Sequence, residues 1–346
     1  MRVNAPSQPT RLSVLDRSLA RQGHDHSQAL RDTVRFARET EALGYHRFWV
    51  SEHHGVPGVA GSAPTVLAAA VAAVTSRIRI GTGGVMLPNH RPLVVAEQFG
   101  VLESLYPGRI DMGLGRSVGF TGGIRRALGH DRRDAEDFGA QLAELLGYFT
   151  GDQKTYPGVH ALPAEGLRVP AYVLATGAGA DIAAEHGLPL VIAAVGGHER
   201  TLEAITRYRR NFRPSAWSAQ PYVIVAAGIA VAETTERARR LQVPEAWATV
   251  FSRTRGVFPP LSPAGEILSL EMTARERALF EEALQGQIHG TEEEVADALG
   301  ALVERSGAEE VLVTMNTFDQ DERLDSYRRL ARLAGAGAFA GVARGR

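Results

Sequence analysis

The chain has 346 residues, of which 44% are hydrophobic, so it is long and apolar enough to bury a substantial core. Its formal net charge of −1 comes from 38 basic and 39 acidic residues, which argues against a nucleic-acid partner. The absence of cysteine excludes disulfides and thiolate chemistry. No apolar run reaches the roughly 20 residues of a membrane span, and the N-terminus lacks the apolar region of a secretory signal. We therefore expect a cytoplasmic protein without a membrane partner.

The first third of the chain alternates between short β-rich runs and helical runs. Strands are predicted at 12–16, 45–50 and 78–80, and helices at 27–43, about 64–75 and 92–105. Ser27 is the expected N-cap of the first helix and Gly44 its left-handed stop. Pro92 suits the first turn of the third helix. Three strand–helix units are thus predicted in about 100 residues.

The same alternation continues to the end of the chain. Further strands are predicted at 110–115, 172–174, 190–194, 222–230 and 309–315, and further helices near 135–149, 199–209 and 291–306. Thr291 and Glu294 have the spacing of a capping box, and Gly307 is placed to end that helix. The count of predicted strands is then eight.

Eight alternating strand–helix units predict an α/β fold of the (β/α)8 TIM-barrel type, with an open doubly wound sheet as the alternative. Because no change of composition marks a boundary, we expect one domain over 1–346, with a core at about 11–335 and a flexible tail at about 336–346. An insertion is expected at about 241–290, between the seventh and eighth strands. It could be a lid over the site or a surface excursion.

Several strands end in residues suited to binding, and the second ends in Glu52, His53 and His54. A histidine at the C-terminal mouth of a barrel can exchange protons near neutral pH, so His53 is the candidate catalytic residue. For His54, a structural role fits the sequence at least as well. Because neighbouring strand residues point to opposite faces, we expect these side chains not to converge, and no metal site is predicted.

Gly83 and Gly84 follow the third strand. Without side chains they would let a flat ligand lie against the backbone, although a tight turn alone would also explain them. Strained or cis peptides occur at such places, so the Gly83–Gly84 bond is a candidate for one.

The run GLGRSVG at 113–119 has three interpretations. Its spacing does not fit a dinucleotide loop. Gly115 to Gly119 match the G-x-S-x-G elbow of a serine hydrolase with Ser117 as nucleophile, but that elbow needs a helix directly after the serine. In the third interpretation Arg116 binds an anion such as phosphate. The small residues of ATGAG at 175–179, before a predicted helix, could supply the other half of a phosphate clamp.

The chain resembles the bacterial luciferase-like flavin monooxygenases over about residues 11–335. The resemblance is densest in three blocks, WVSEHHG (49–55), RIRIGTGGVMLPNHRPLVVAEQFGVLESLYPGRIDMGLGRS (77–117) and GTEEEVADAL (290–299). It implies a TIM barrel that binds reduced FMN and activates O2 as a flavin hydroperoxide to oxidise a small organic substrate. His53 then matches the histidine that assists the chemistry. The cofactor-binding residues implied are Glu52, Gly83, Gly84, Arg116, Ser117, Val118, Leu174, Thr176, Gly177 and Ala180.

Two departures limit what the resemblance implies. Gly177 and Ala180 stand where luciferase grips phosphate with hydroxyl side chains, and Gly115 stands where luciferase has a reactive cysteine. Luminescence is therefore not implied. Because no nicotinamide site is evident, we expect a separate flavin reductase as partner, and the resemblance also suggests a homodimer. The alternatives are an F420-dependent oxidoreductase that needs no O2, the Ser117 hydrolase, and a non-catalytic flavin-binding subunit.

Overall fold

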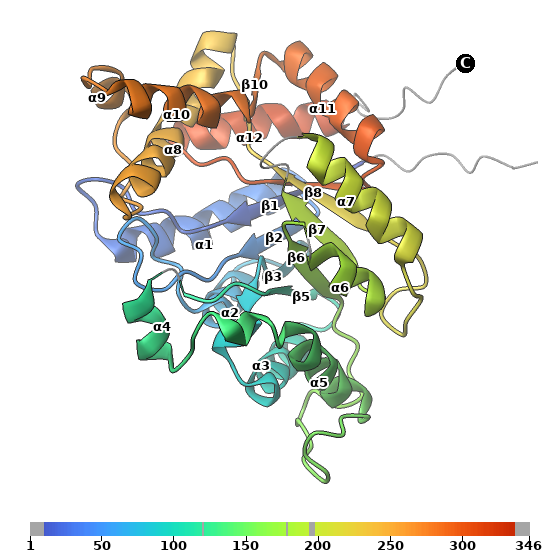
Figure 1. The fold of residues 1–346 in the computed structure, drawn as a ribbon. Coiled ribbons are helices and arrows are strands. Elements are labelled where there is room, and N and C mark those ends of the chain that lie inside the picture. Colours follow the sequence, from blue (N-terminus) through green and yellow to red (C-terminus); the bar gives the residue numbers. More distant parts are fainter. Residues whose placement is uncertain (1–9, 120, 178, 194–197, 336–346) are drawn as a thin grey trace, which may run out of the picture.

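The computed structural model describes residues 10–119, 121–177, 179–193 and 198–335. Within these residues, parallel strands close into a barrel, because β3 pairs with β5 as well as with β2 (Figure 1). The eight barrel strands are β1 (Arg11–Asp16), β2 (Arg47–Val50), β3 (Arg79–Thr82), β5 (Ile110–Gly115), β6 (Ala171–Ala175), β7 (Leu190–Ala193), β8 (Val223–Ala227) and β11 (Glu310–Val313). The short β4 (Val85–Met86) extends the wall beside β5. The closed barrel confirms the predicted fold and excludes the open sheet.

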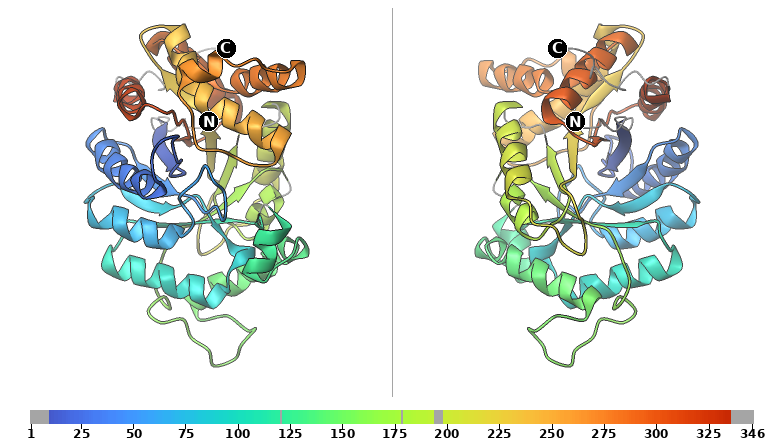
Figure 2. Two further views of the ribbon diagram at one scale, coloured as in Figure 1. Left: turned by 90° about the vertical axis from the view of Figure 1, so that its left-hand side faces the viewer. Right: turned by 90° about the vertical axis from the view of Figure 1, so that its right-hand side faces the viewer.

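Helices surround the strands on the outside, as both views of Figure 2 show. The helices between consecutive barrel strands, and after the last, are α1 (His26–Ala42), α2 (Pro64–Ala73), α3 (Pro92–Leu105), α5 (Phe138–Thr150), α6 (Gly179–Glu185), α7 (His198–Asn211), α11 (Glu292–Ser306) and α12 (Gln320–Gly335). Three short turns of helix lie in the connections, η1 (Leu87–Asn89), α4 (Gly122–Leu128) and η2 (Arg133–Ala135).

Most helix ends follow the predicted local chemistry. Gly44 (φ +84°) and Gly307 (φ +59°) are left-handed, and Thr291 and Glu294 form the capping box. The prediction for Ser27 is wrong: α1 already begins at His26, with Asp25 in the N-cap position and no side-chain cap.

Two predicted elements differ from the structure. The predicted strand 222–230 is broken at Gly228, where a β-carbon would lie 1.6 Å from Oε1 of Gln287. The helix predicted from 135 begins at Phe138, because η2 precedes it. Residue 194 of the predicted strand 190–194, and the predicted tail at 336–346, lie outside the described residues.

The barrel interior has an apolar layer above a charged one. The apolar layer consists of Leu15, Trp49, Tyr172, Val191, Ile224 and Leu312, all buried. Towards the N-terminal ends of the strands, Arg47 pairs with Asp111 (2.7 Å) and Glu310 (3.0 Å). Since a buried guanidinium needs such partners, this network fills the lower barrel. The apolar layer therefore forms the floor of any cavity at the C-terminal ends of the strands.

An insertion lies between β8 and β11, and Figure 1 shows its helices grouped together above α1. It comprises β9 (Ile229–Val231), α8 (Thr235–Arg255), α9 (Ala264–Leu268), α10 (Ala274–Gln285) and β10 (Ile288–Gly290). Its helices share a small core around Trp247 and Phe280. Three backbone hydrogen bonds fasten it to the loops after β1 and β2: from Gln22 N to Leu261 O (2.8 Å), from Leu261 N to Ala20 O (2.9 Å) and from Gly58 N to Phe258 O (2.9 Å).

None of the described helices is both long enough and apolar enough to span a membrane.

Candidate active site

A cavity of about 940 Å³ opens at the C-terminal ends of the barrel strands. Its floor includes Leu15, Val191 and Leu312 of the apolar layer, and its walls come from the segments after the strands and from the insertion. The polar residues that line it are Arg17, Glu52, His53, His54, Asn89, Arg116, Ser117, Arg125, Arg132, Thr176, Glu245, Gln287 and Thr314. The volume lies near the upper end of the range for small-molecule sites.

Most of the predicted site residues line this cavity. They are Glu52, His53, Gly84, Arg116, Ser117, Val118, Leu174 and Thr176. The other three, Gly83, Gly177 and Ala180, are not among the lining residues. Ala180 is buried, and its backbone N–H donates to the carbonyl of Gly177 (3.0 Å). Of the predicted phosphate turn, Thr176 therefore faces the cavity and Ala180 supports the turn from behind.

The Gly83–Gly84 peptide is cis, as the sequence suggested. A β-carbon on Gly83 would lie 2.5 Å from Cδ1 of Leu15, and one on Gly84 would lie 2.7 Å from the carbonyl oxygen of Gly113. Close packing against backbone therefore requires glycine at position 84, independently of any ligand, whereas the contact at Gly83 is with the end of a flexible leucine side chain that can move. Gly84 nevertheless lines the cavity and presents bare backbone there.

Glu52 is the centre of a hydrogen-bond network at the cavity wall. Its Oε1 accepts from His54 Nε2 (2.8 Å) and Asn89 Nδ2 (3.2 Å), and its Oε2 accepts from His90 Nε2 (2.9 Å) and Met86 N (3.0 Å). The Glu52 side chain is fully buried. Burial alone would raise the pKa of Glu52, but the hydrogen bonds from His90, Met86 and His54 outweigh it and lower the pKa below its ordinary value.

The three side chains of Glu52, His53 and His54 do not converge as a set, because His53 is hydrogen-bonded to Ser51 whereas His54 is hydrogen-bonded to Glu52. Glu52 is joined instead by His90, which lies far from it in the sequence. Glu52, His54 and His90 bring their ligand atoms within 4.8 Å of one another, a grouping compatible with a metal ion. Because four donors already occupy the carboxylate oxygens of Glu52, hydrogen bonding accounts for this cluster as it stands.

The contacts that place His53 include two hydrogen bonds. Its backbone N–H donates to the carbonyl of Gly61 (2.8 Å), and its ring Nδ1 is hydrogen-bonded to Oγ of the buried Ser51 (3.1 Å). Burial, followed by the positive charge of Arg17, lowers the pKa of His53 to about 4. The imidazole facing the cavity is therefore uncharged at neutral pH.

Arg116, which follows β5, lies against the start of α6. A β-carbon on Gly179 would lie 3.8 Å from Cδ of Arg116. The structure thus brings together the arginine and the turn that the sequence proposed as two halves of an anion site. The serine-hydrolase interpretation is not supported, because α4 begins only at Gly122 and no helix follows Ser117 directly.

Sequence reasoning missed several cavity residues. Asn89 and its neighbour His90 lie in LPNHRP, which we interpreted only as a helix start, although a histidine soon after a strand was the same signal used for His53. Arg17 follows β1 directly, and we had singled out residues in the same position after other strands, such as His53 and Arg116, but not after this one. Glu245 and Gln287 come from the insertion, and neither has a local pattern that marks it.

A closed parallel barrel with one large cavity at the C-terminal ends of its strands is the arrangement of TIM-barrel enzymes. The sequence profile of the luciferase-like monooxygenases matches residues 10–310. YvbT of Bacillus subtilis (strain 168) is 40% identical over 95% of this chain and 98% of its own length. A luciferase-like monooxygenase of Escherichia coli (strain K12) is 35% identical over 91% of this chain and 94% of its own length. The chain belongs to the luciferase-like monooxygenase family and is an enzyme.

Solved structures share this fold. Apo-MsnO8 superposes with a TM-score of 0.86 at 32% identity, covering 94% of this chain and 98% of that chain. Two more distant structures, both with a TM-score of 0.68 and 16% identity, share the fold: an oxygenating constituent of 3,6-diketocamphane monooxygenase in complex with FMN, and an F420-dependent secondary alcohol dehydrogenase. Among curated relatives, the N-acetyl-S-alkylcysteine monooxygenase of Bacillus subtilis is 34% identical over 84% of this chain and 88% of its own length.

Proposed function

We propose that this protein is a monooxygenase that uses reduced FMN and O2 to oxidise a small organic substrate. The observation that carries the proposal is the single cavity in which Arg116, bare backbone at Gly84 and an uncharged His53 occupy different parts of the wall. Arg116 is suited to an anionic tail of the ligand, the bare backbone at Gly84 to a flat ring, and His53 to a reacting group.

The residues fit a flavin mononucleotide. Arg116 and Thr176 are suited to the phosphate, because a guanidinium and a hydroxyl beside the start of a helix donate strong hydrogen bonds to phosphate oxygens. Gly84 and Leu174 offer bare backbone and an apolar side chain for the ring. When bound, reduced FMN would supply the electrons that activate O2.

His53 is the proposed proton acceptor, and Glu52 holds the wall beside it. Ser117 and Val118 line the cavity next to Arg116, whereas Gly83, Gly177 and Ala180 shape the backbone behind the lining residues. These roles follow from position and from the chemistry of each group.

The proposed substrate shares the cavity with the cofactor. The remaining wall carries polar groups from the insertion, Glu245 and Gln287, and apolar ones from the barrel, such as Ala226. Because a relative is named for its action on N-acetyl-S-alkylcysteines, these thioethers are the first substrates to test.

Two partners belong to the proposal. A separate reductase would supply reduced FMN, as the sequence suggested. A second copy of this chain could cover exposed apolar side chains on α2 and α3, where Val66 is 70% exposed and Leu105 is 63% exposed.

Anaerobic titration with reduced FMN tests the cofactor assignment. Arg116→Ala should weaken binding by roughly 1.5–3 kcal/mol, about 10- to 150-fold, as loss of a charge-assisted hydrogen bond does. Arg133→Ala is the matched control, because Arg133 is exposed, pairs with Asp131 and does not line the cavity. Equal affinity of the two variants would remove Arg116 from the phosphate site. Tight binding of F420 with turnover that needs no O2 would favour the alternative cofactor.

A further inference from the structure

Two segments that help to line the cavity are fastened to the barrel very differently. One is the insertion, which contributes Glu245. The other is the segment 121–137, which contains α4 and η2 and contributes Arg125, Arg132 and Ala135. Figure 1 shows α4 apart from the helices of the insertion. Which of the two can move decides how a cofactor and a substrate are enclosed.

Backbone pairing holds the insertion to the loop after β1. Leu261 donates its N–H to the carbonyl of Ala20 (2.9 Å), and its own carbonyl accepts from Gln22 N (2.8 Å). The Leu261 side chain is buried among apolar side chains of the loops after β1 and β2. An ion pair between Arg17 and Glu245 of α8 adds a second attachment. Opening the insertion would break these bonds and expose the apolar cluster, so the insertion is a fixed wall.

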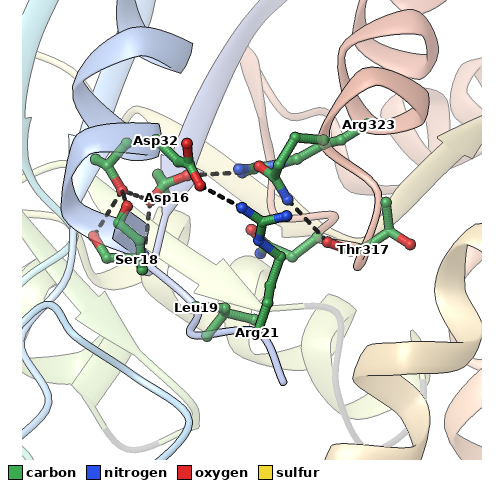
Figure 3. A pocket seen from close by; sticks show the side chains of 11 residues that line it. Asp16, Ser18, Leu19, Arg21, Asp32, Thr317 and Arg323 are labelled. Atoms are coloured by element: carbon green, nitrogen blue, oxygen red, sulfur yellow. Dashed lines mark hydrogen bonds and ion pairs between the residues drawn. The ribbon is translucent and has the colours of Figure 1, made fainter. Parts of the chain in front are cut away.

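The loop that holds the insertion is itself anchored by charged pairs. Arg323 of α12 pairs with Asp16 (2.8 Å), and Arg21 pairs with Asp32 of α1 (2.6 Å). Figure 3 shows Arg323 and Arg21 facing these carboxylates. The four side chains are largely or fully buried, and breaking such a pair leaves an uncompensated charge. The loop therefore gives the insertion a rigid attachment.

The segment 121–137 is attached by much less. All residues of α4 and η2 are described, and none of them is buried. Arg125 donates to the carbonyl of Gly119 (2.7 Å). The other hydrogen bonds of the segment between described residues join its own members, as His130 and Asp134 do (2.9 Å). A segment with few buried contacts opens at low cost in free energy, and this one keeps its internal bonds when it moves.

One apolar side chain seats α4 on the barrel. A β-carbon on Gly55 would lie 3.0 Å from Cδ1 of Ile124, and one on Gly119 would lie 2.7 Å from its Cγ2. Ile124 thus rests against bare backbone after two barrel strands. For a β-carbon on Gly123, the nearest atom is Oγ1 of Thr121 at 3.8 Å. Packing does not require glycine at 123, and its effect is to give the start of α4 extra backbone freedom.

We propose that the segment 121–137 is the moving wall of the active site. It moves about the Ile124 contact and closes over an occupied cavity, while the insertion stays in place. The inference rests on the proposed function for what occupies the cavity. It transfers the role of a lid from the insertion, where the sequence allowed one, to a different segment. Because three residues of this segment line the cavity, its closure changes the wall that faces a bound ligand.

Limited digestion of the full chain with trypsin locates the moving wall, because the cutting rate follows the population of the locally opened form. Both walls contain arginines, which are Arg125, Arg126, Arg132 and Arg133 in the segment 121–137, and Arg253, Arg255, Arg275 and Arg277 in the insertion. Without any ligand, the first cuts should fall in the segment 121–137. First cuts in the insertion would overturn the proposal.

Two substitutions should change the rate of the cut after Arg132 in opposite directions. Ile124→Ala should raise it about tenfold, because the apolar contact that seats the segment is lost. Gly123→Ala should lower it about two- to fivefold, because alanine fits at this position and restricts the opened form. Leu268→Ala is the matched control and should leave the rate unchanged, since it removes a 49% exposed apolar side chain from the insertion.

An unchanged rate in Ile124→Ala, or an equal rise in Leu268→Ala, would contradict the proposal. If Ile124→Ala does not fold, Gly123→Ala decides, because an unchanged rate in that variant is also contrary to the proposal. These comparisons need neither flavin nor substrate.

Saturation with reduced FMN under anaerobic conditions tests closure separately. Bound flavin should slow the cut after Arg132 and leave cutting in the insertion unchanged. If a titration shows that the flavin is bound and the cut is not slowed, closure over the ligand is wrong. If no flavin binds, the proposed function fails, whereas the digestion without ligand still decides which wall moves.

Discussion

Replacing Glu52 by glutamine should destabilise the protein more than a change of one atom suggests. The two carboxylate oxygens of Glu52 each accept two hydrogen bonds, from His54 and Asn89 on one side and from His90 and Met86 on the other. Glutamine has only one oxygen, and its NH2 group would face two donors whichever way it turned.

The magnitude follows from the two hydrogen bonds that glutamine cannot accept. Hydrogen bonds to a charged group contribute about 1.5–3 kcal/mol each, which gives about 3–6 kcal/mol for two. The side chains of His54 and His90 are 24% and 29% exposed, so water can replace part of this stabilisation. We expect the free energy of unfolding to fall by about 3 kcal/mol, measured by urea denaturation at neutral pH.

Glu41→Gln is the matched control. Glu41 also accepts three hydrogen bonds, from the backbone N–H groups of Ser76, Arg77 and Ile78, but all three reach the same oxygen, Oε1. A glutamine carbonyl can replace that oxygen, so the free energy of unfolding should fall by less than about 1 kcal/mol. Equal destabilisation in the two variants would refute the account of Glu52, because net charge would then matter more than the distribution of donors.

Two further substitutions test the site and the wall. His53→Gln should lower turnover far more than it lowers flavin affinity. In the parent, the free energy of unfolding should fall by about 3 kcal/mol at most as the pH drops from 6.5 towards 4, because in that window His53 binds a proton in the unfolded chain but not in the folded one. His53→Gln should lack this pH-dependent fall. Gly113→Ala places a carbon 1.9 Å from the carbonyl oxygen of Thr82 and should cost at least about 3 kcal/mol, whereas Gly300→Ala, with nothing within 4 Å, should be neutral or stabilising.

The barrel could be predicted because its information is local. Alternation of strand and helix, the stop at Gly44 and the capping box at Thr291 and Glu294 each depend on a few neighbouring residues. Ser27 failed as a cap because Asp25 lies two residues upstream and the helix begins one residue earlier than the pattern suggested.

The site was only partly predictable, because its partners are distant in sequence. His90 lies 38 residues after Glu52, and Glu245 lies 228 residues after Arg17, so no local spacing pairs them. The Gly83–Gly84 pair was interpreted as a ligand platform, yet the closest atoms to its missing side chains belong to Leu15 and Gly113 of the barrel wall. The strand ends that line the cavity could thus be predicted from the sequence, but the hydrogen bonds and ion pairs between distant segments could not.

Rapid mixing of O2 with protein loaded anaerobically with reduced FMN tests whether this enzyme activates O2 through a bound flavin. We expect a transient species whose absorption differs from that of both reduced and oxidised FMN, formed in the parent and decaying faster when a substrate is present. Oxidation of the bound flavin at the rate of free reduced FMN, without such a transient, would contradict it. So would substrate conversion that proceeds undiminished with O2 excluded.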